Sequence, residues 1–306
     1  DEQPAVGQEP ERPGVIQPMR DGDRLHFAGD PPQAGRHIRR AGFDFAEGTE
    51  LLALGALITP PTIALALTAG HATLAVHRAP SIAIIDSGDE LSADPAHCLS
   101  HQMPASNGAM LQAMLAQLPC TVRRIGPIAD DLTALARALE QAEGADIVVT
   151  SGGASVGDHD LIRPALDQWN ARIDFWRVAI KPGKPLLVAR RGEQTILGLP
   201  GNPVSSFVTA YLFLLPLVRH VAGSASPMPV ALRLPVGLPV QPGGKRMEFL
   251  RARWDGRCVT PLDEQDSSAL RALAAANAVI ERPIGAPSAD AGETVTAYLF
   301  ENGGIA

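Results

Sequence analysis

The chain has 306 residues, of which 45% are hydrophobic and 4% aromatic, enough for two or three domains with aliphatic cores. Its net charge of -7 argues against nucleic acid as the main partner, and no basic amphipathic stretch points to a membrane surface. The acidic, proline-rich start is unlike a secretory signal and the three cysteines are widely spaced, so we expect reduced thiols in a cytoplasmic protein.

The first 79 residues contain little regular structure. Residues 1–34 are rich in Pro, Gly, Asp and Glu, which predicts loops and a hairpin around Asp21-Gly22-Asp23. Further along, Pro60-Pro61 opens a short helix that ends at Gly70.

From Pro80 to Gly223, strand patterns alternate with helical ones. This alternation is typical of βαβ units and predicts a three-layer α/β domain, with a mainly parallel sheet and helices on both faces. The longest apolar run, Phe207–Val218, is too short to span a bilayer and indicates a buried helix. We expect strands at 81–86, 120–128, 147–150, 175–180, 186–189 and 195–199, and helices at 106–118 (capped by Ser106), 132–142, 161–169 and 203–221.

Residues 224–229 form a linker to a small β-rich domain. Short strand-like runs are broken there by Gly and Pro, and we expect strands at 230–234, 249–254, 278–280 and 294–299 and a helix at 268–275. The sequence therefore predicts a division into residues 1–79, 80–223 and 224–306.

The most informative segment joins the strand at 147–150 to the helix that follows it. It reads Ser151-Gly152-Gly153-Ala154-Ser155-Val156-Gly157, and the acids Asp158 and Asp160 come next. Glycines let a backbone approach a ligand closely, and open α/β sheets bind phosphorylated ligands at the carboxyl ends of strands. The segment predicts a phosphate-binding loop whose acids are candidates for holding a metal ion.

Other polar loops follow neighbouring strands, so we expect them to meet at the same edge of the sheet. Lysines neutralise phosphate, whereas carboxylates repel it unless an ion such as Mg²⁺ bridges the two. The combination predicts nucleotide or phosphoester chemistry with Mg²⁺. The loops are Ser87-Gly88-Asp89-Glu90, Ala129-Asp130-Asp131, Leu199-Pro200-Gly201-Asn202-Pro203 and the basic Lys181-Pro182-Gly183-Lys184.

Each of these residues also has a purely structural interpretation. Asp131 is well placed to cap the following helix, Asp89 to form an Asx turn, and Glu90 to lie in solvent. His159 is typical of a surface loop, and Pro200 and Pro203 of strand and helix ends. The sequence contains no nucleophile elbow, Walker motif or dinucleotide fingerprint. The prediction of a phosphate and Mg²⁺ site therefore depends on the convergence of the loops.

Over about residues 35–300 the chain resembles the molybdopterin molybdenumtransferases, the MoeA and gephyrin E-domain family. The motifs that carry the resemblance are Ser87–Leu91, Ser151–Gly157 with Asp160, Ile180–Pro185 and Gly198–Ser205, in the family's order and spacing. It implies a three-layer α/β domain with a C-terminal β-barrel-like domain and elongated N-terminal domains, assembled as a homodimer. It also implies Mg²⁺-dependent insertion of molybdenum from molybdate into adenylylated molybdopterin, with release of AMP.

The resemblance also implies roles for individual residues. The functional acids fall on Glu90, Asp130 and Asp160, of which Glu90 and Asp160 would hold Mg²⁺ or orient the attacking group. Lys181 is a catalytic position and, with Lys184, would offset charge on phosphate or molybdate. Arg177 stands where the family has a lysine, which keeps the charge but changes the geometry. The other implied substrate-binding residues are Ser151, Gly152, Gly153, Ser155, Gly157, Pro200, Gly201, Asn202, Pro203 and Ser205.

The resemblance is weakest near the N-terminus. Met19-Arg20-Asp21-Gly22 only faintly matches the family's Met-Asp-Gly-Tyr-Ala stretch, and residues 1–79 are interpreted as a remnant of its truncated N-terminal domains. This departure leaves open a rival interpretation, a non-catalytic molybdopterin-binding or scaffold module. A third, hydrolysis of a nucleotide pyrophosphate by a related α/β protein, is disfavoured by the loop Pro200–Pro203 and the C-terminal domain. Besides a second subunit, a molybdopterin adenylyltransferase is an expected partner.

Overall fold

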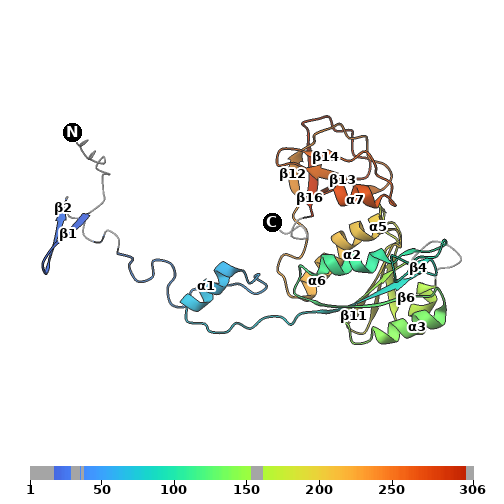
Figure 1. Ribbon diagram of the computed structural model, residues 1–306, viewed down its shortest axis with the longest axis horizontal. Helices are drawn as coiled ribbons and strands as arrows, with labels where there is room; N and C mark the ends of the chain where they lie inside the picture. The colour runs from blue at the N-terminus through green and yellow to red at the C-terminus, as the bar shows by residue number, and fades with distance from the viewer. Residues whose placement is uncertain (1–16, 29–34, 36–37, 153–160, 301–306) are drawn as a thin grey trace, which may run out of the picture. The chain divides into compact units, whose positions relative to one another are not determined.

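The computed structural model describes residues 17–28, 35, 38–152 and 161–300, and the chain divides into two units, 1–51 and 52–306 (Figure 1). The first unit contains an antiparallel hairpin of β1 (Gln17–Asp21) and β2 (Arg24–Ala28). Gly22 in its turn has a φ of +58°, a left-handed conformation that glycine adopts readily. The hairpin predicted around this glycine is confirmed.

The second unit begins near a short helix that its prolines predicted. Helix α1 spans Pro60–Thr68, and Thr59 caps it by accepting a hydrogen bond from the backbone N–H of Thr62. Proline is tolerated at the first helical position because the N–H there has no intrahelical acceptor. Ala66 is the one buried residue of α1, so most of the helix surface is accessible.

A six-stranded sheet in the order β6-β3-β7-β11-β10-β8 forms the centre of the second unit. β3 pairs in parallel with β6 and β7, and β7 pairs in parallel with β11. β10 runs antiparallel between β11 and β8, so β8 points the same way as the four parallel strands. Their bounds are β3 Ser81–Ser87, β6 Thr121–Ile128, β7 Ile147–Ser151, β8 Arg172–Trp176, β10 Leu187–Arg191 and β11 Gln194–Leu199.

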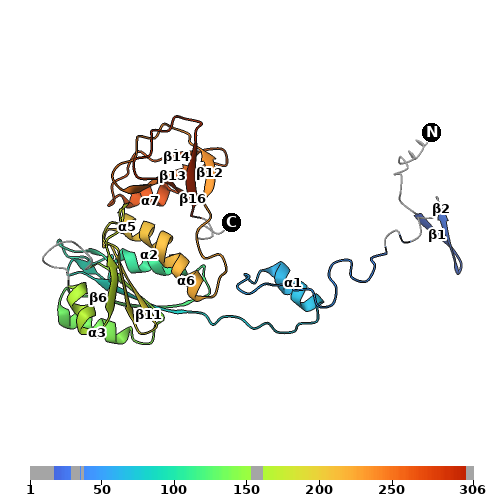
Figure 2. The same ribbon diagram turned by 180° about the vertical axis from the view of Figure 1, so that it is seen from behind.

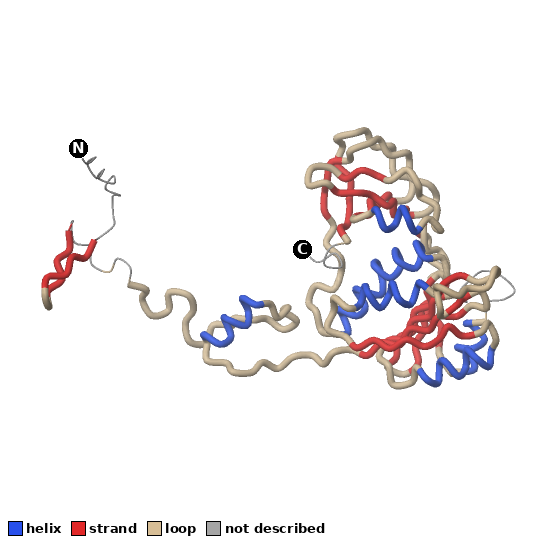
Figure 3. Tube along the Cα trace, in the orientation of Figure 1, coloured by secondary structure: helices blue, strands red, loops and turns tan. Residues whose placement is uncertain are grey.

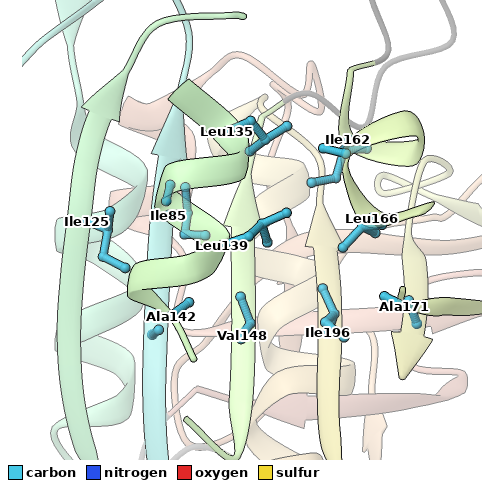
Figure 4. Packing of buried hydrophobic residues seen from close by; sticks show 14 of the residues in the cluster. Ile85, Ile125, Leu135, Leu139, Ala142, Val148, Ile162, Leu166, Ala171 and Ile196 are labelled. Carbon is cyan, nitrogen blue, oxygen red and sulfur yellow. The ribbon is translucent and has the colours of Figure 1, made fainter. Parts of the chain in front are cut away.

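Helices cover both faces of this sheet and make the predicted three layers (Figures 1 and 2). On one face, α3 (Leu132–Gln141) and α4 (Ile162–Gln168) bury leucines and isoleucines against β3, β7 and β11, as Figure 4 shows. On the other face, α2 (Ser106–Leu115) and the long helix that starts at Pro203 pack against the same strands. Because both faces are covered, the central strands are continuous apolar runs.

The long helix has three parts: α5 (Pro203–Thr209), the π-helical η1 (Ala210–Leu214) and α6 (Leu215–Val221). Pro216 has no N–H to donate to the carbonyl of Leu212, which favours an interruption of the α-helix here. By length and composition the helix could cross a membrane, but 67% of its apolar window is buried inside the protein. It is a core helix, as the sequence predicted.

The C-terminal part is a β domain with one helix, α7 (Leu270–Ala275) (Figure 3). Its strand order is β12-β16-β15-β13-β14, and β9 (Ile180–Lys181), from the preceding part of the chain, pairs in parallel with β13. A small parallel pair, β4 (Leu91–Ser92) and β5 (Met103–Pro104), lies apart from both sheets. The remaining bounds are β12 Leu232–Pro235, β13 Met247–Trp254, β14 Val259–Pro261, β15 Ala278–Arg282 and β16 Thr294–Leu299. The predicted fold class, α/β with a C-terminal β-rich domain, is confirmed.

Two details of the predicted elements are wrong. The strand expected at 175–180 ends at Trp176, because Arg177 has a φ of +78°, outside the extended range of a strand. Ser106 does not cap α2: the N-cap residue is Ala105, and no side chain caps this end. Instead, the carboxylate of Asp86 packs against Gly108 in the first turn, where a Cβ would overlap it.

Candidate functional site

The carboxyl ends of β3, β6, β7, β8 and β11 lie at one edge of the central sheet, because these strands point the same way. The loops expected to carry the chemistry follow these strands, and the basic loop 177–186 connects β8 to β10 at the same edge. The topology therefore brings the candidate loops to one side of the sheet, as the alternation of strands and helices predicted.

The loops after β3 and β6 are tied together by their polar side chains. The Ser87 hydroxyl donates to Asp130 Oδ1 at 2.6 Å, and the N–H of Asp130 donates to Asp89 Oδ1 at 3.0 Å. Asp89 thus links two loops instead of closing a turn of its own. Glu90 is exposed, and its carboxylate lies so close to Gly88 that a Cβ there would be 2.7 Å from Oε2.

The glycine-rich loop begins where three strands end close together. Ser151 is buried, and the N–H of Gly152 donates to the carbonyl of Leu199 at 3.4 Å. A Cβ on Gly152 would lie 2.4 Å from the carbonyl oxygen of Ser87, so this position requires glycine. Gly153, Ser155, Gly157 and Asp160 lie outside the described residues, and their predicted roles remain predictions.

The start of the long helix lies beside this loop. A Cβ on Gly201 would be 3.5 Å from the Gly152 Cα, and the carbonyl of Gly201 accepts a hydrogen bond from Asn107 Nδ2 at 2.7 Å. Pro200 and Ser205 are buried, whereas Asn202 and Pro203 are half-buried. Asn202 is the N-cap residue of α5, but its side chain makes no capping hydrogen bond.

Several buried polar atoms at this edge lack a hydrogen-bond partner within the described ranges. They are Ser151 Oγ, Asn107 Oδ1, Asn202 Oδ1 and Ser206 Oγ. Buried polar atoms are normally satisfied by protein, water or ligand. Their concentration between the glycine-rich loop and the helix start marks this part of the edge as suited to a polar ligand.

The basic loop contributes three cations with different surroundings. Arg177 lies with its guanidinium carbon 3.9 Å from the ring centroid of Trp176, and Arg163 stacks on the same ring at 4.6 Å. Lys181 Nζ lies 3.2 Å from Glu248 Oε1 of β13. The Lys184 side chain is exposed, while its carbonyl accepts from the N–H groups of Val178 and Leu186.

The acids differ in how available they are to a cation. Asp130 and Asp89 are engaged in the hydrogen bonds between the loops, whereas the exposed Glu90 carboxylate has no side-chain hydrogen bond in the described part of the chain. No group of three or more His, Cys, Asp or Glu side chains suited to a metal occurs in that part. Glu90 is therefore a possible ligand for Mg²⁺, which accepts one or two carboxylates and fills its other positions with water and phosphate oxygens.

The sequence did not single out Asp86, the last acid before this edge. The residue is 1% exposed, and Arg124 Nη2 donates to Oδ2 at 3.1 Å. Burial raises the pKa of Asp86, while the bond from Arg124 opposes that rise. An acid inside the apolar run 82–85 and directly before Ser87 was the available signal. Asn107 and Arg163 also escaped notice, and neither occurs in a distinctive sequence pattern.

Two family models and several curated proteins match this chain. Residues 83–220 match a family model described as "Probable molybdopterin binding domain", and residues 233–300 match "MoeA C-terminal region (domain IV)". The molybdopterin molybdenumtransferase of Haemophilus influenzae is 34% identical over 193 residues, or 63% of this chain and 48% of its own length. That of Bacillus subtilis is 31% identical over 280 residues, or 89% of this chain and 65% of its own length.

A solved structure has a similar fold. The crystal structure of a molybdopterin biosynthesis MoeA protein from Pyrococcus horikoshii superposes with a TM-score of 0.74 and 26% identity, covering 85% of this chain and 64% of that one. The chain thus spans less than two thirds of these similar proteins, and its two matched regions are its central sheet domain and its C-terminal β domain.

Proposed function

We propose, from the premise that the chain belongs to the MoeA family, that it inserts molybdenum into adenylylated molybdopterin and releases AMP, forming molybdenum cofactor. The observation that carries the proposal is that the acidic loops after β3 and β6, the beginning of the glycine-rich loop and the start of α5 lie at one edge of the sheet. We also propose the division into residues 1–79, 80–223 and 224–306 as the functional organisation of the chain.

In this proposal the glycine-rich loop and the start of α5 bind the phosphate of the pterin nucleotide. Ser151 and Gly152 would supply the first contacts, and Gly153, Ser155 and Gly157 would continue the loop around the anion. Ser205 and the segment Pro200, Gly201, Asn202 and Pro203 would form the opposite wall. Unpaired N–H groups and the positive end of the helix dipole favour an anion there.

The acids and cations would divide the remaining tasks. Glu90 and Asp160 would hold Mg²⁺, which when bound offsets negative charge on the phosphates. Asp130 is hydrogen-bonded to Ser87 and Asp89, and it would hold the two acidic loops in fixed positions beside the substrate. Arg177, Lys181 and Lys184 would offset the charge of phosphate or molybdate.

We further propose a homodimer that acts in the cytoplasm. Apolar side chains in and before α1 are exposed, among them Leu54, Leu57, Ile63 and Leu67, and a second subunit would cover such a surface. A molybdopterin adenylyltransferase would be the partner that delivers the adenylylated substrate.

The test is an AMP-release assay with adenylylated molybdopterin, molybdate and Mg²⁺. We expect release that depends on molybdate and on Mg²⁺, and removal of Mg²⁺ by a chelator should abolish it. Asp160→Asn should lower turnover by about a hundredfold or more, because one electrostatic contact at the reacting group is worth a few kcal/mol. Since a loop acid contributes little to the core, urea unfolding of the variant should match the wild type.

Other outcomes would reject particular parts of the proposal. Tight binding of adenylylated molybdopterin without AMP release would identify a non-catalytic binding module. Wild-type turnover in Asp160→Asn would reject Asp160 as a metal ligand.

A further inference from the structure

We propose that Glu248 of the C-terminal β domain is a positioning residue that holds Lys181 ready to receive an anionic ligand. This inference rests on the proposed function only through the role of Lys181 as an anion-binding residue. It gives the C-terminal domain a direct part in the site, although the domain follows the other candidate residues in sequence.

The backbone places the two residues side by side. β9 pairs in parallel with β13, with Ile180 opposite Met247 and Lys181 opposite Glu248. The N–H of Met247 donates to the carbonyl of Ala179 at 2.9 Å, which fixes this register. Lys181 is therefore attached to the C-terminal sheet. The ends of the same loop, beside β8 and β10, are joined by the N–H of Arg177, which donates to the carbonyl of Leu186.

The side chains complete the attachment. Lys181 Nζ lies 3.2 Å from Glu248 Oε1, and the exposed side-chain fractions are 51% for Lys181 and 19% for Glu248. The carboxylate is therefore the more buried partner, and about half of the lysine side chain is accessible to solvent. Gly244 is a neighbour of the same carboxylate, since a Cβ there would lie 3.5 Å from Oε1.

Lys181 keeps hydrogen-bond donors for a ligand after it pairs with Glu248. An ammonium group has three donors, and Glu248 accepts from one of them, so two are left for a ligand. A free lysine loses much rotamer entropy when a ligand immobilises it, about 0.5–1.5 kcal/mol for such a side chain, corresponding to about twofold to tenfold in affinity. A lysine already held by Glu248 has paid most of that loss on folding.

Two opposing effects of Glu248 can be separated by substitution. Its negative charge disfavours a nearby anion, so charge alone predicts that any neutral replacement tightens anion binding. Its hydrogen bond orients Lys181, so positioning predicts that alanine weakens binding while glutamine, which keeps an acceptor oxygen, does not.

The experiment is isothermal titration calorimetry of the full chain with AMP and, separately, with molybdate. We expect Lys181→Met to weaken binding of at least one of these anions about tenfold, the value of one charge-assisted hydrogen bond. Glu248→Ala should weaken the same anion about fivefold, and Glu248→Gln less than about twofold. In the Lys181→Met background, Glu248→Ala should have no further effect, because a positioning residue acts only through the lysine.

The inference is overturned if Glu248→Ala leaves both affinities unchanged, tightens them, or weakens them equally when the lysine amine is absent. The matched control is Glu143→Ala, which removes an ion pair of similar length, 3.1 Å to Arg191, at the opposite edge of the sheet. An equal loss of affinity in this control would also overturn the inference. If the coupling is found but adenylylated molybdopterin is not turned over, the proposed reaction fails while the positioning role stands.

Discussion

Asp130 and Asp131 are adjacent acids with different surroundings. Asp131 is the N-cap residue of α3, where its carboxylate accepts from the N–H of Ala134 at 2.8 Å. Asp130 instead accepts from the Ser87 hydroxyl at the edge of the sheet. The first contact stabilises a helix, whereas the second fixes the geometry of the proposed site.

Substituting each acid by alanine should therefore separate stability from activity. Asp131→Ala should lower the free energy of unfolding by about 1 kcal/mol through the lost cap, with AMP release close to wild type. Asp130→Ala should reduce AMP release by at least about tenfold, with a smaller change in stability. Urea unfolding and the AMP assay measure the two effects, and a loss of activity in Asp131→Ala alone would reverse the assignment.

Asp86 makes folding stability depend on pH. Burial raises its pKa in the folded protein above the unfolded value of about 3.9, so the folded state retains a proton that the unfolded state has released. The contribution of this carboxyl to stability is therefore lost as pH rises from about 4 through the folded pKa.

Asp86→Asn removes this titration. We expect the free energy of unfolding of the variant, relative to wild type, to increase as pH rises from about 4 through the folded pKa of Asp86 and then level off. Urea titrations at several pH values measure the difference, and a difference independent of pH would show that Asp86 does not titrate in this range.

Some contacts of individual residues can be predicted from the sequence, and others cannot. The cap by Asp131 is visible in sequence because the donor lies three residues away. The partner of Asp86, Arg124, lies 38 residues away on a neighbouring strand, and no local pattern encodes that contact. Hydrogen bonds between residues close in sequence are thus predictable. Contacts between strands can be predicted only when the register of the strands is known.

Among the elements, the basic loop between β8 and β10 is constrained by close packing against the long helix. Gly183 has a φ of +110°, and a Cβ there would lie 2.4 Å from Thr209 Cγ2 in α5. The loop can approach the long helix this closely only because residue 183 has no side chain.

Gly183→Ala should lower the free energy of unfolding by about 2–5 kcal/mol. The left-handed conformation contributes about 1–2 kcal/mol, and overpacking against Thr209 adds about 1–3 kcal/mol. The control is Gly192→Ala in the β10–β11 turn, where φ is +56° and no atom lies within 4 Å, so only about 1–2 kcal/mol is expected. Equal losses in the two variants, measured by urea unfolding, would contradict the packing argument.

The elements were predictable where the hydrophobic pattern was long and regular. β7 and α3 agree closely with expectation, since a buried run and a helical repeat specify them. The π-helical segment and β14 were not expected, because a local change in helical pairing and a three-residue strand leave little periodicity. The strand expected at 175–180 failed because the left-handed conformation of Arg177 has no signature in the sequence.

At the scale of the whole molecule, the exposed apolar surface of α1 bears on assembly. Ile63 and Leu67 lie one helical turn apart and are 48% and 60% exposed. An apolar helix face of this kind is stabilised when a partner covers it, in keeping with the proposed homodimer.

Ile63→Glu and Leu67→Glu should shift the protein from dimer to monomer, because a charge buried at an interface without a partner is strongly unfavourable. Sedimentation equilibrium at micromolar concentration measures the shift. The control is Leu99→Glu, at a leucine that is 61% exposed and lies in a loop outside α1. This variant should stay dimeric. A wild-type protein that sediments as a monomer would rule out the dimer.

The sequence motifs predicted only part of the arrangement of the whole molecule. The motif loops gave the family and the edge of the sheet at which they meet, because parallel strands leave few alternatives. They did not indicate that Lys181 pairs with the C-terminal β domain, since β9 has only two residues and its partner lies more than sixty positions later.

This two-residue strand has a consequence for engineering chimaeras between related proteins. A graft that exchanges everything beyond the linker would separate Ile180 and Lys181 from the β13 sequence with which they pair. Junctions should therefore keep residues 180–181 and 247–248 from the same parent. Hybrids that take these two segments from different parents should bind the ligand more weakly, even when each half folds.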